Sequence, residues 1–172
     1  DSVASRGLGD VYKRQIGVAR DLAAVLNHNN IKCQLNFADI SAFKEGSEEP
    51  LSIEVKDEKS CPRYAGVSIK NVKVKASPDW LQKRLQSIGL TPINNVVDIT
   101  NYVLHETGQP LHAFDAKKIE KDTLIVQQLK DKTKFTTLDD VERELSSEDL
   151  MICDGKNQPM CIAAVSYTHL TL

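Results

Sequence analysis

The densest group of chemically capable side chains surrounds the turn Gly108-Gln109-Pro110. Groups that can donate, accept or shuttle protons could hold a water molecule and an ester carbonyl there without a metal. The alternative is that they only satisfy buried backbone groups at a tight turn, and the residue types alone favour this alternative because such clusters are common. The cluster, which falls within thirteen residues, consists of Thr100, Asn101, Glu106, Gln109 and His112.

Two elements must position this cluster. Apolar and β-branched residues in Asn94–His105 fit one stripe of a helix, although their β-branched content would also suit a strand. We expect the helix, closed by Gly108, with Thr100 and Asn101 near its C-terminal half. A strand at Leu111–Phe114 would then begin near His112 and fold it back beside them.

The rest of the chain predicts an α+β domain. One helix is expected at Ile16–Asn27, and a second follows Ser77 as its cap and Pro78 in its first turn, with Gly89 as its stop. Short strands with interspersed helices indicate a mainly antiparallel sheet with packed helices. The expected strands are Arg63–Ile69, Val72–Val74, Leu111–Phe114, Thr123–Leu129, Lys134–Leu138, Met151–Cys153 and Met160–Ala163, with Lys70-Asn71 as a bend and Asp154-Gly155 as a hairpin turn.

Composition excludes several classes of protein. The 172 residues carry a net charge of −2 and are 41% hydrophobic, which is typical of a globular domain and excludes a wholly basic nucleic-acid binder. No apolar run approaches the roughly 18–20 residues of a membrane span, so no membrane association is expected. The four cysteines form no C-x-x-C pair, so we interpret them as reduced core thiols and expect no metal site. They are Cys33, Cys61, Cys153 and Cys161.

The middle of the chain contains an acidic stretch followed by a basic one. Residues 41–60 contain six acids and three bases, which indicates a solvated linker over 41–58. The following stretch, Cys61–Leu90, has six bases against the single acid Asp79. It could contact RNA phosphates, although a solvated charged face is the commoner meaning of such a stretch.

One long run resembles a known family. Residues 95–116, NVVDITNYVLHETGQPLHAFDA, resemble the signature of the β chain of bacterial phenylalanyl-tRNA synthetases, in particular its editing domain. The likeness extends over CPRYAGVSIKNVKVKASPDWLQKRLQSIGLTPIN before this run and the strands LIVQQLK and LMICDGKNQPMCIA after it. It also includes IGVARDLAAVL, so about 16–163 is covered.

The resemblance implies a function and a site. Family enzymes attach phenylalanine to tRNA(Phe) with ATP and magnesium, as cytoplasmic assemblies of two α and two β chains. The α chain performs that chemistry, and no cofactor is implied for this segment. The middle of the β chain hydrolyses tRNA wrongly charged with tyrosine, since a phenylalanine site discriminates only partially against one added hydroxyl. Its Thr-Asn pair and G-Q-P-x-H histidine map onto Thr100, Asn101 and His112, with His112 positioning water and the other two holding the amino acid and the ester.

The resemblance also divides the chain. Residues 1–15 and 165–172 have no family counterpart and resemble translated sequencing-adaptor tails. Between them we expect a helical segment at 16–40, the linker at 41–58 and a partial editing domain at 59–164 that lacks the glutamate that recognises the tyrosine hydroxyl. The other hypothesis is a non-catalytic RNA- or protein-binding module of the same fold, which would bind through Cys61–Leu90. Such a module would need none of Thr100, Asn101 and His112.

A partial domain should expose apolar surface. The strands of the incomplete layer would present residues that the missing part normally covers, and the isolated chain should be prone to aggregate.

Overall fold

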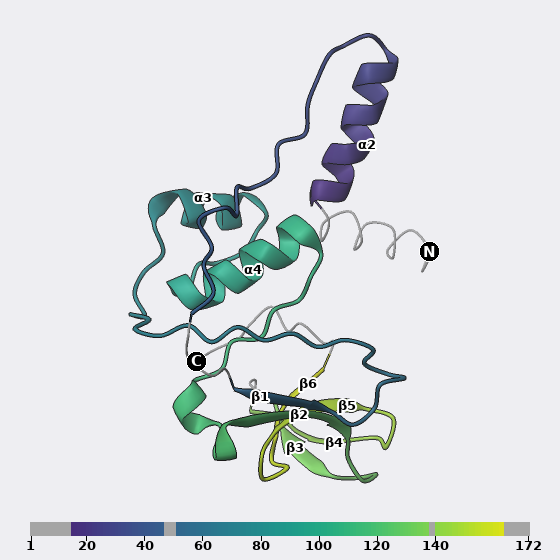
Figure 1. Ribbon diagram of the computed structural model, residues 1–172, viewed down its shortest axis with the longest axis vertical. Coiled ribbons are helices and arrows are strands. Elements are labelled where there is room, and N and C mark those ends of the chain that lie inside the picture. The colour runs from purple at the N-terminus through teal and green to yellow at the C-terminus, as the bar shows by residue number, and fades with distance from the viewer. Residues whose placement is uncertain (1–14, 47–50, 138–139, 164–172) are drawn as a thin grey trace. The chain divides into compact units, whose positions relative to one another are not determined.

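The computed structural model describes residues 15–46, 51–137 and 140–163, which fall into two compact units (Figure 1). The described residues of 1–48, 77–93 and 98–111 form the first unit, and those of 49–76, 94–97 and 112–172 form the second. The first unit is helical and the second contains the sheets. The α+β class predicted from the sequence is therefore confirmed.

Three α-helices occur among the described residues, and all three were predicted. They end where the sequence provides a stop: Asn30 has a positive φ of 61° after the first, and glycines with φ of 84° and 79° follow the other two. No helix in these ranges is long and apolar enough to cross a membrane. The helices are α2 (Gln15–His28), α3 (Asp79–Ser87) and α4 (Asn95–Thr107).

Helix α3 shows how local chemistry sets its boundaries. Pro78 is its N-cap residue, with φ −63° and ψ 151°, and both Leu81 and Leu85 are 1% exposed. At the C-terminus, the N–H of Gly89 donates to Gln86 O at 3.0 Å, and φ of +84° suits glycine. The predicted cap by Ser77 is wrong, because its hydroxyl donates instead to the carboxylate of Asp98.

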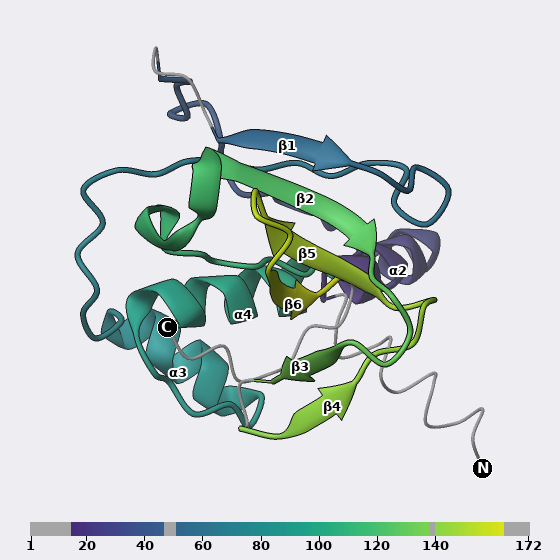
Figure 2. The same ribbon diagram turned by 90° about the horizontal axis from the view of Figure 1, so that it is seen from below.

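A four-stranded sheet organises the second unit, with the order β1-β2-β5-β6 (Figure 2). The pair β1–β2 is parallel, and the pairs β2–β5 and β5–β6 are antiparallel. A separate hairpin pairs β3 with β4. The strands are β1 (Ser52–Val55), β2 (Thr123–Gln128), β3 (Lys134–Thr136), β4 (Glu142–Glu144), β5 (Leu150–Asp154) and β6 (Pro159–Ile162).

Both faces of the central strands are buried. Alternate residues of β2 and β5 contribute to two apolar clusters, one around Val126 and Ile152 and the other around Ile125 and Met151. Val126, Ile152 and Met151 are 0% exposed. A strand buried on both faces appears in the sequence as a continuous apolar run, and LIV and MIC are such runs.

Several predicted strands are wrong. Residues 63–69, 72–74 and 111–114 form no strand, and β1 lies inside the range 41–58 interpreted as linker. At 72–74 the backbone bonds to a side chain instead: Asn95 Nδ2 donates to Lys73 O at 3.1 Å. The bend at Lys70-Asn71 is present, with φ of 57° at Asn71. Strand β4 was not predicted, and Leu138, at the end of a predicted strand, lies outside the described residues.

Most of the exposed apolar residues lie on α2 and on two segments without helix or strand, 31–43 and 67–74. In α2, Val18, Leu22 and Val25 are 44%, 55% and 58% exposed, and residues 67–74 include Val67 and Ile69 at 71% and 74%. No large hydrophobic residue of the described strands is largely exposed, but all four residues of β6 are partly exposed, so the expected exposure of strand surface stays a prediction. The aggregation tendency of the isolated chain stays a prediction.

Gly155, in the β5–β6 turn, provides a stability test. A Cβ atom there would lie 2.6 Å from Glu120 O and 2.8 Å from Lys121 Cβ. Because the first contact is with backbone, we expect Gly155→Ala to lower the free energy of unfolding by about 1–3 kcal/mol. Gly46→Ala, with nothing within 4 Å of the added Cβ, is the matched control. Denaturant unfolding should separate the two variants, and equal midpoints would contradict the steric argument.

Candidate functional site

Helix α4, which carries two of the predicted site residues, has Asn94 as a side-chain cap at its N-terminus. Asn94 Oδ1 accepts hydrogen bonds from the N–H groups of Val96 and Val97, each at 3.0 Å. These bonds satisfy two of the donors that a helix N-terminus leaves without a partner. At the other end, Gly108 N donates to Leu104 O at 2.8 Å. Asn94 and Gly108 thus bound α4, and the helical spacing between them determines which of its residues share a face.

Thr100 and Asn101 lie on the buried face of α4. They follow Val97 at helical spacing and precede Leu104, and these two apolar residues are 1% and 3% exposed. Thr100 is 9% exposed and Asn101 is 6% exposed. A hydroxyl and an amide thus occupy an otherwise apolar stripe, where an ester or amino group could meet them with little competition from water.

The amide of Asn101 is not sealed in apolar surroundings. Among the described residues, no fully buried side-chain nitrogen or oxygen lacks a hydrogen-bond partner. The polar atoms of Asn101 therefore have a partner or reach solvent, despite the low exposure of the residue. An amide in this position can donate to a carbonyl oxygen and accept from an amino group.

His112 has a half-buried imidazole in the second unit. It belongs to an irregular segment and not to the predicted strand. Its ring stacks on Phe114 with ring centroids 6.3 Å apart, and its Nδ1 lies 3.8 Å from Cys161 Sγ of β6. Burial lowers the pKa of the imidazole, so the ring is neutral at pH 7. A neutral imidazole can accept a proton or orient a water molecule.

The predicted cluster is thus brought together in part. Thr100 and Asn101 share a face of α4 in the first unit, whereas His112 belongs to the second. Two other residues of the cluster have local hydrogen-bond partners. Glu106 Oε1 accepts a hydrogen bond from the Tyr102 hydroxyl at 2.9 Å, and the backbone N–H of Gln109 donates to Thr107 Oγ1 at 3.1 Å. Burial, and to a lesser extent the hydrogen bond to Glu106, raises the pKa of Tyr102. The side-chain amide of Gln109 also donates to Pro110 O at 3.4 Å, so Glu106 and Gln109 are both engaged by local hydrogen bonds.

A buried carboxylate next to the site was not predicted. Asp98 is 1% exposed and accepts two hydrogen bonds, one from the Ser77 hydroxyl and one from Ile93 N at 2.8 Å. It ties Ser77, two residues before α3, and the loop before α4 to the first turn of α4, where a negative charge is also favoured. A single aspartate in a helical pattern gave no sequence signal for this role.

Asn95 plays the corresponding part in the second unit. Its Oδ1 accepts from Lys75 N at 3.0 Å, and its own N–H donates to Lys75 O at 2.8 Å. With the bond from its Nδ2 to Lys73 O, these contacts hold the extended segment at 73–75 against the start of α4. The run NVVDITN (residues 95–101) therefore joins two anchoring residues to the candidate site pair.

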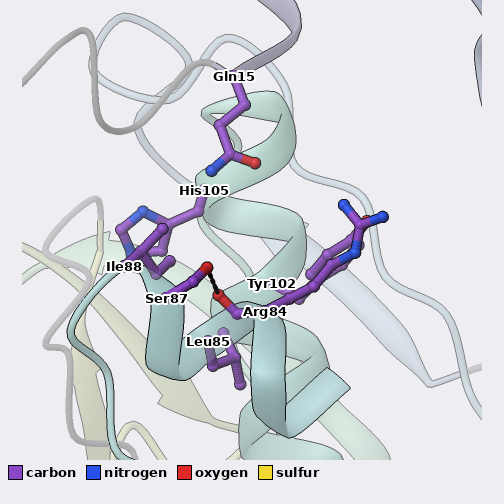
Figure 3. A pocket seen from close by; sticks show the side chains of 7 residues that line it. All are labelled: Gln15, Arg84, Leu85, Ser87, Ile88, Tyr102 and His105. Carbon is purple, nitrogen blue, oxygen red and sulfur yellow. Dashed lines mark hydrogen bonds between the residues drawn. The ribbon is translucent and has the colours of Figure 1, made fainter. Parts of the chain in front are cut away.

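A small pocket in the first unit lies among other residues. Its volume is about 60 Å³, and its lining includes Arg84, Tyr102 and His105 (Figure 3). Trp80 contacts Tyr102 edge-on, with ring centroids 5.7 Å apart. A pocket of this size holds a few water molecules. Thr100 and Asn101 do not line it.

The cysteines lie in or against the apolar clusters of the second unit, except Cys33. Cys153 is 0% exposed, and Cys61 and Cys161 pack against the cluster around Val126. Burial raises the pKa of the Cys161 thiol to about 12. Nowhere in the described part of the chain do three or more histidine, cysteine or acidic side chains group in a way that could hold a metal.

The comparisons with known proteins agree with the sequence resemblance. Residues 60–169 match the B3/4 domain. The phenylalanine--tRNA ligase beta subunits of Porphyromonas gingivalis and Bacteroides thetaiotaomicron are each 52% identical to the chain, over 149 and 150 residues. That of Carboxydothermus hydrogenoformans is 46% identical over 150 residues. Each match covers 87% of this chain and 18% of the relative, so the chain spans under a fifth of the relatives' length.

The resemblance noted from VVDITNY and GQPLHAFD is therefore confirmed, and the domain and tail boundaries stay predictions. With 110 of its 172 residues inside the match at 60–169, the chain belongs to the B3/4 domain family.

Proposed function

We propose that this chain is part of the beta subunit of a phenylalanine--tRNA ligase and contributes to the synthesis of phenylalanyl-tRNA in translation. The observation that carries the proposal is the 52% identity over 87% of the chain to proteins of that name. The partners that follow are tRNA(Phe) and an α subunit, in a cytoplasmic assembly of two α and two β chains.

We further propose that the segment contributes to hydrolytic editing of tyrosyl-tRNA(Phe). A site that accepts phenylalanine rejects one added hydroxyl only partially, so a second, hydrolytic site raises fidelity. The buried pair Thr100–Asn101 and the neutral imidazole of His112 support this proposal, because ester hydrolysis needs groups that hold the ester and orient a water molecule.

The proposed reaction is a simple ester hydrolysis. His112 holds the attacking water, whose oxygen adds to the carbonyl carbon that links tyrosine to the terminal ribose of the tRNA. The bond from that carbon to the ribose oxygen then breaks, and the ribose oxygen takes up a proton from the water. Asn101 would donate to the carbonyl oxygen as negative charge develops there, and Thr100 would hold the amino acid.

ATP and magnesium would serve the complete enzyme at another place. Magnesium prefers carboxylate oxygens and phosphates, and no group of three candidate ligands occurs in the described ranges. The proposed hydrolysis uses side chains of this chain and a water molecule, and no step of it passes through a metal ion.

The alternative is a non-catalytic RNA- or protein-binding module. It is favoured by one observation: the bases of Cys61–Leu90, including Arg63, Lys73 and Lys75, are exposed. Such a module would bind tRNA with a strong dependence on salt and would hydrolyse no ester. Hydrolysis of tyrosyl-tRNA therefore separates the two functions.

The pH profile of hydrolysis tests the proposed role of His112. Burial lowers its pKa below the ordinary 6.5, so the neutral, active form persists into mildly acidic solution. We expect kcat/KM for tyrosyl-tRNA(Phe) to stay level from pH 8 to about 6.5 and to fall at lower pH as the ring is protonated. The complete enzyme would be assayed, with the spontaneous rate subtracted at each pH.

His112→Gln provides the control, because its amide does not titrate. This variant should lose the acid decline along with most of the rate. An acid decline of the same shape in His112→Gln would assign the titration to another group. Absence of hydrolysis in the unaltered enzyme at every pH would favour the binding module.

A further inference from the structure

One nitrogen of the His112 imidazole is already engaged within the second unit. Nδ1 lies 3.8 Å from Cys161 Sγ, which is within the range of a hydrogen bond to sulfur. The ring also stacks on Phe114 with an angle of 19° between the two planes. These two contacts fix both the plane of the ring and the direction of Nδ1, so Nε2 is the nitrogen that remains for a substrate.

The sulfur has a rigid support. Cys161 lies in β6 and is paired with Ile152 of β5, which is 0% exposed. Phe114 and Cys161 both pack against the apolar cluster around Val126. A contact held by the sheet core does not need an induced rearrangement to form.

The chemistry of this pair differs from that of a cysteine nucleophile. A nucleophilic thiol needs a lowered pKa and an ion pair with imidazolium. Here burial raises the pKa of Cys161 to about 12 and lowers that of His112, so both groups are neutral near pH 7. The neutral sulfur can accept a hydrogen bond from Nδ1–H or donate its own proton to Nδ1.

We propose that Cys161 is a positioning residue for His112: its sulfur accepts the Nδ1–H bond and thereby leaves the lone pair of Nε2 free to accept a proton of the attacking water. This inference rests on the proposed editing function and adds a residue to it. The hydrogen bond of one ring nitrogen sets the protonation of the other, and a base must present an unprotonated nitrogen to the water.

The tautomer can be measured without any activity assay. Long-range proton–nitrogen spectra of the ¹⁵N-labelled chain, with the His112 signals assigned by their loss in His112→Gln, should show a protonated Nδ1 and an unprotonated Nε2. In Cys161→Ala, the two nitrogen shifts should move toward each other as the tautomers mix. Cys161→Ser, which keeps an acceptor, should stay close to the unaltered chain.

Cys61→Ala is the matched control. Cys61 is also half-buried and packs against the same cluster, but its sulfur contacts Arg63 O at 3.6 Å and not the imidazole. Its substitution should leave the His112 shifts unchanged. A protonated Nε2 in the unaltered chain, or shifts that do not respond to Cys161→Ala, would overturn the inference.

Hydrolysis of tyrosyl-tRNA by the complete enzyme provides the second arm. Cys161→Ala should lower kcat about tenfold with little change in KM, because substrate contacts remain and only the base is misaligned. Cys161→Ser should recover most of this loss, and Cys61→Ala should show none. If His112→Ala slows hydrolysis but Cys161→Ala does not, the positioning role is wrong and the proposed function stands. If neither slows it, the editing function itself is wrong.

Discussion

A His112→Ala substitution in the complete beta subunit is expected to slow hydrolysis of tyrosyl-tRNA(Phe) by about tenfold to a thousandfold. Attachment of phenylalanine should stay nearly unchanged, because the proposed role of the imidazole is confined to editing. Removing the ring removes the group that orients the water. The loss is smaller than that for a nucleophile, since water and ester can still meet without it. Both reactions should be measured on the same preparation.

A purely structural role of His112 predicts a different pattern. The ring fills space between Phe114 and Cys161, so its removal could loosen the packing at this edge of the second unit. Both activities would then fall together, and the midpoint of thermal unfolding would fall with them. His28→Ala, at the end of α2, is the matched histidine control and should change neither activity. Parallel loss of both activities in His112→Ala would reject the editing role.

The elements that the sequence predicts correctly are those set by local signals. Pro78 and Gly89 bound α3, and Gly108 closes α4, within a few residues of the positions expected. The predicted side of α4 is also correct, since Val97 and Leu104 are buried at helical spacing. Such signals act over one or two turns of chain and need no distant partner.

The errors arise where a partner far along the chain decides the structure. Ser52 pairs with Thr123, so β1 forms although its own segment is acidic and short of apolar residues. In the opposite case, Val72–Val74 has β-branched content but finds Asn95 in place of a neighbouring strand. Strand formation depends on such pairing more than on intrinsic preference.

In the candidate site, too, features set by local signals could be predicted and features set by distant partners could not. The sequence predicts the helix that carries Thr100 and Asn101, because its periodicity is a local signal, and the structure adds that both residues are buried. Cys161 could not be connected with His112 in advance, because 49 residues separate them and only the sheet places one beside the other. Asp98 was missed for the same reason, since its hydrogen-bond donors precede it by up to 21 residues.

Asp98→Ala should cause a large loss of stability in the first unit. The carboxylate accepts from the Ser77 hydroxyl and from Ile93 N at 2.8 Å, in a site where Ser77 is 5% exposed. Alanine leaves both donors without their acceptor. Hydrogen bonds to charged groups and the desolvation of donors left behind each amount to roughly 1–3 kcal/mol, so we expect a loss of about 3 kcal/mol in the free energy of unfolding.

Three comparison variants separate this mechanism from a general effect of charge. Ser77→Ala removes one donor and leaves the bond to Ile93, so its effect should be about half as large. Asp98→Asn keeps one acceptor oxygen and should lie between the unaltered chain and Asp98→Ala. Asp79→Ala, an exposed acid in the first turn of α3, loses only its interaction with the helix dipole and should change stability by under about 1 kcal/mol.

Amide hydrogen exchange at Ile93 gives the local measurement. The N–H of Ile93 is the backbone donor to Asp98. Its hydrogen exchange should accelerate strongly in Asp98→Ala and much less in Ser77→Ala. Exchange at Ile93 that is equally slow in the unaltered chain and in all four variants would contradict the anchoring role. Because Asp98 lies in the helix that carries Thr100 and Asn101, acceleration at Ile93 together with slower hydrolysis of tyrosyl-tRNA would connect the anchor with the proposed site.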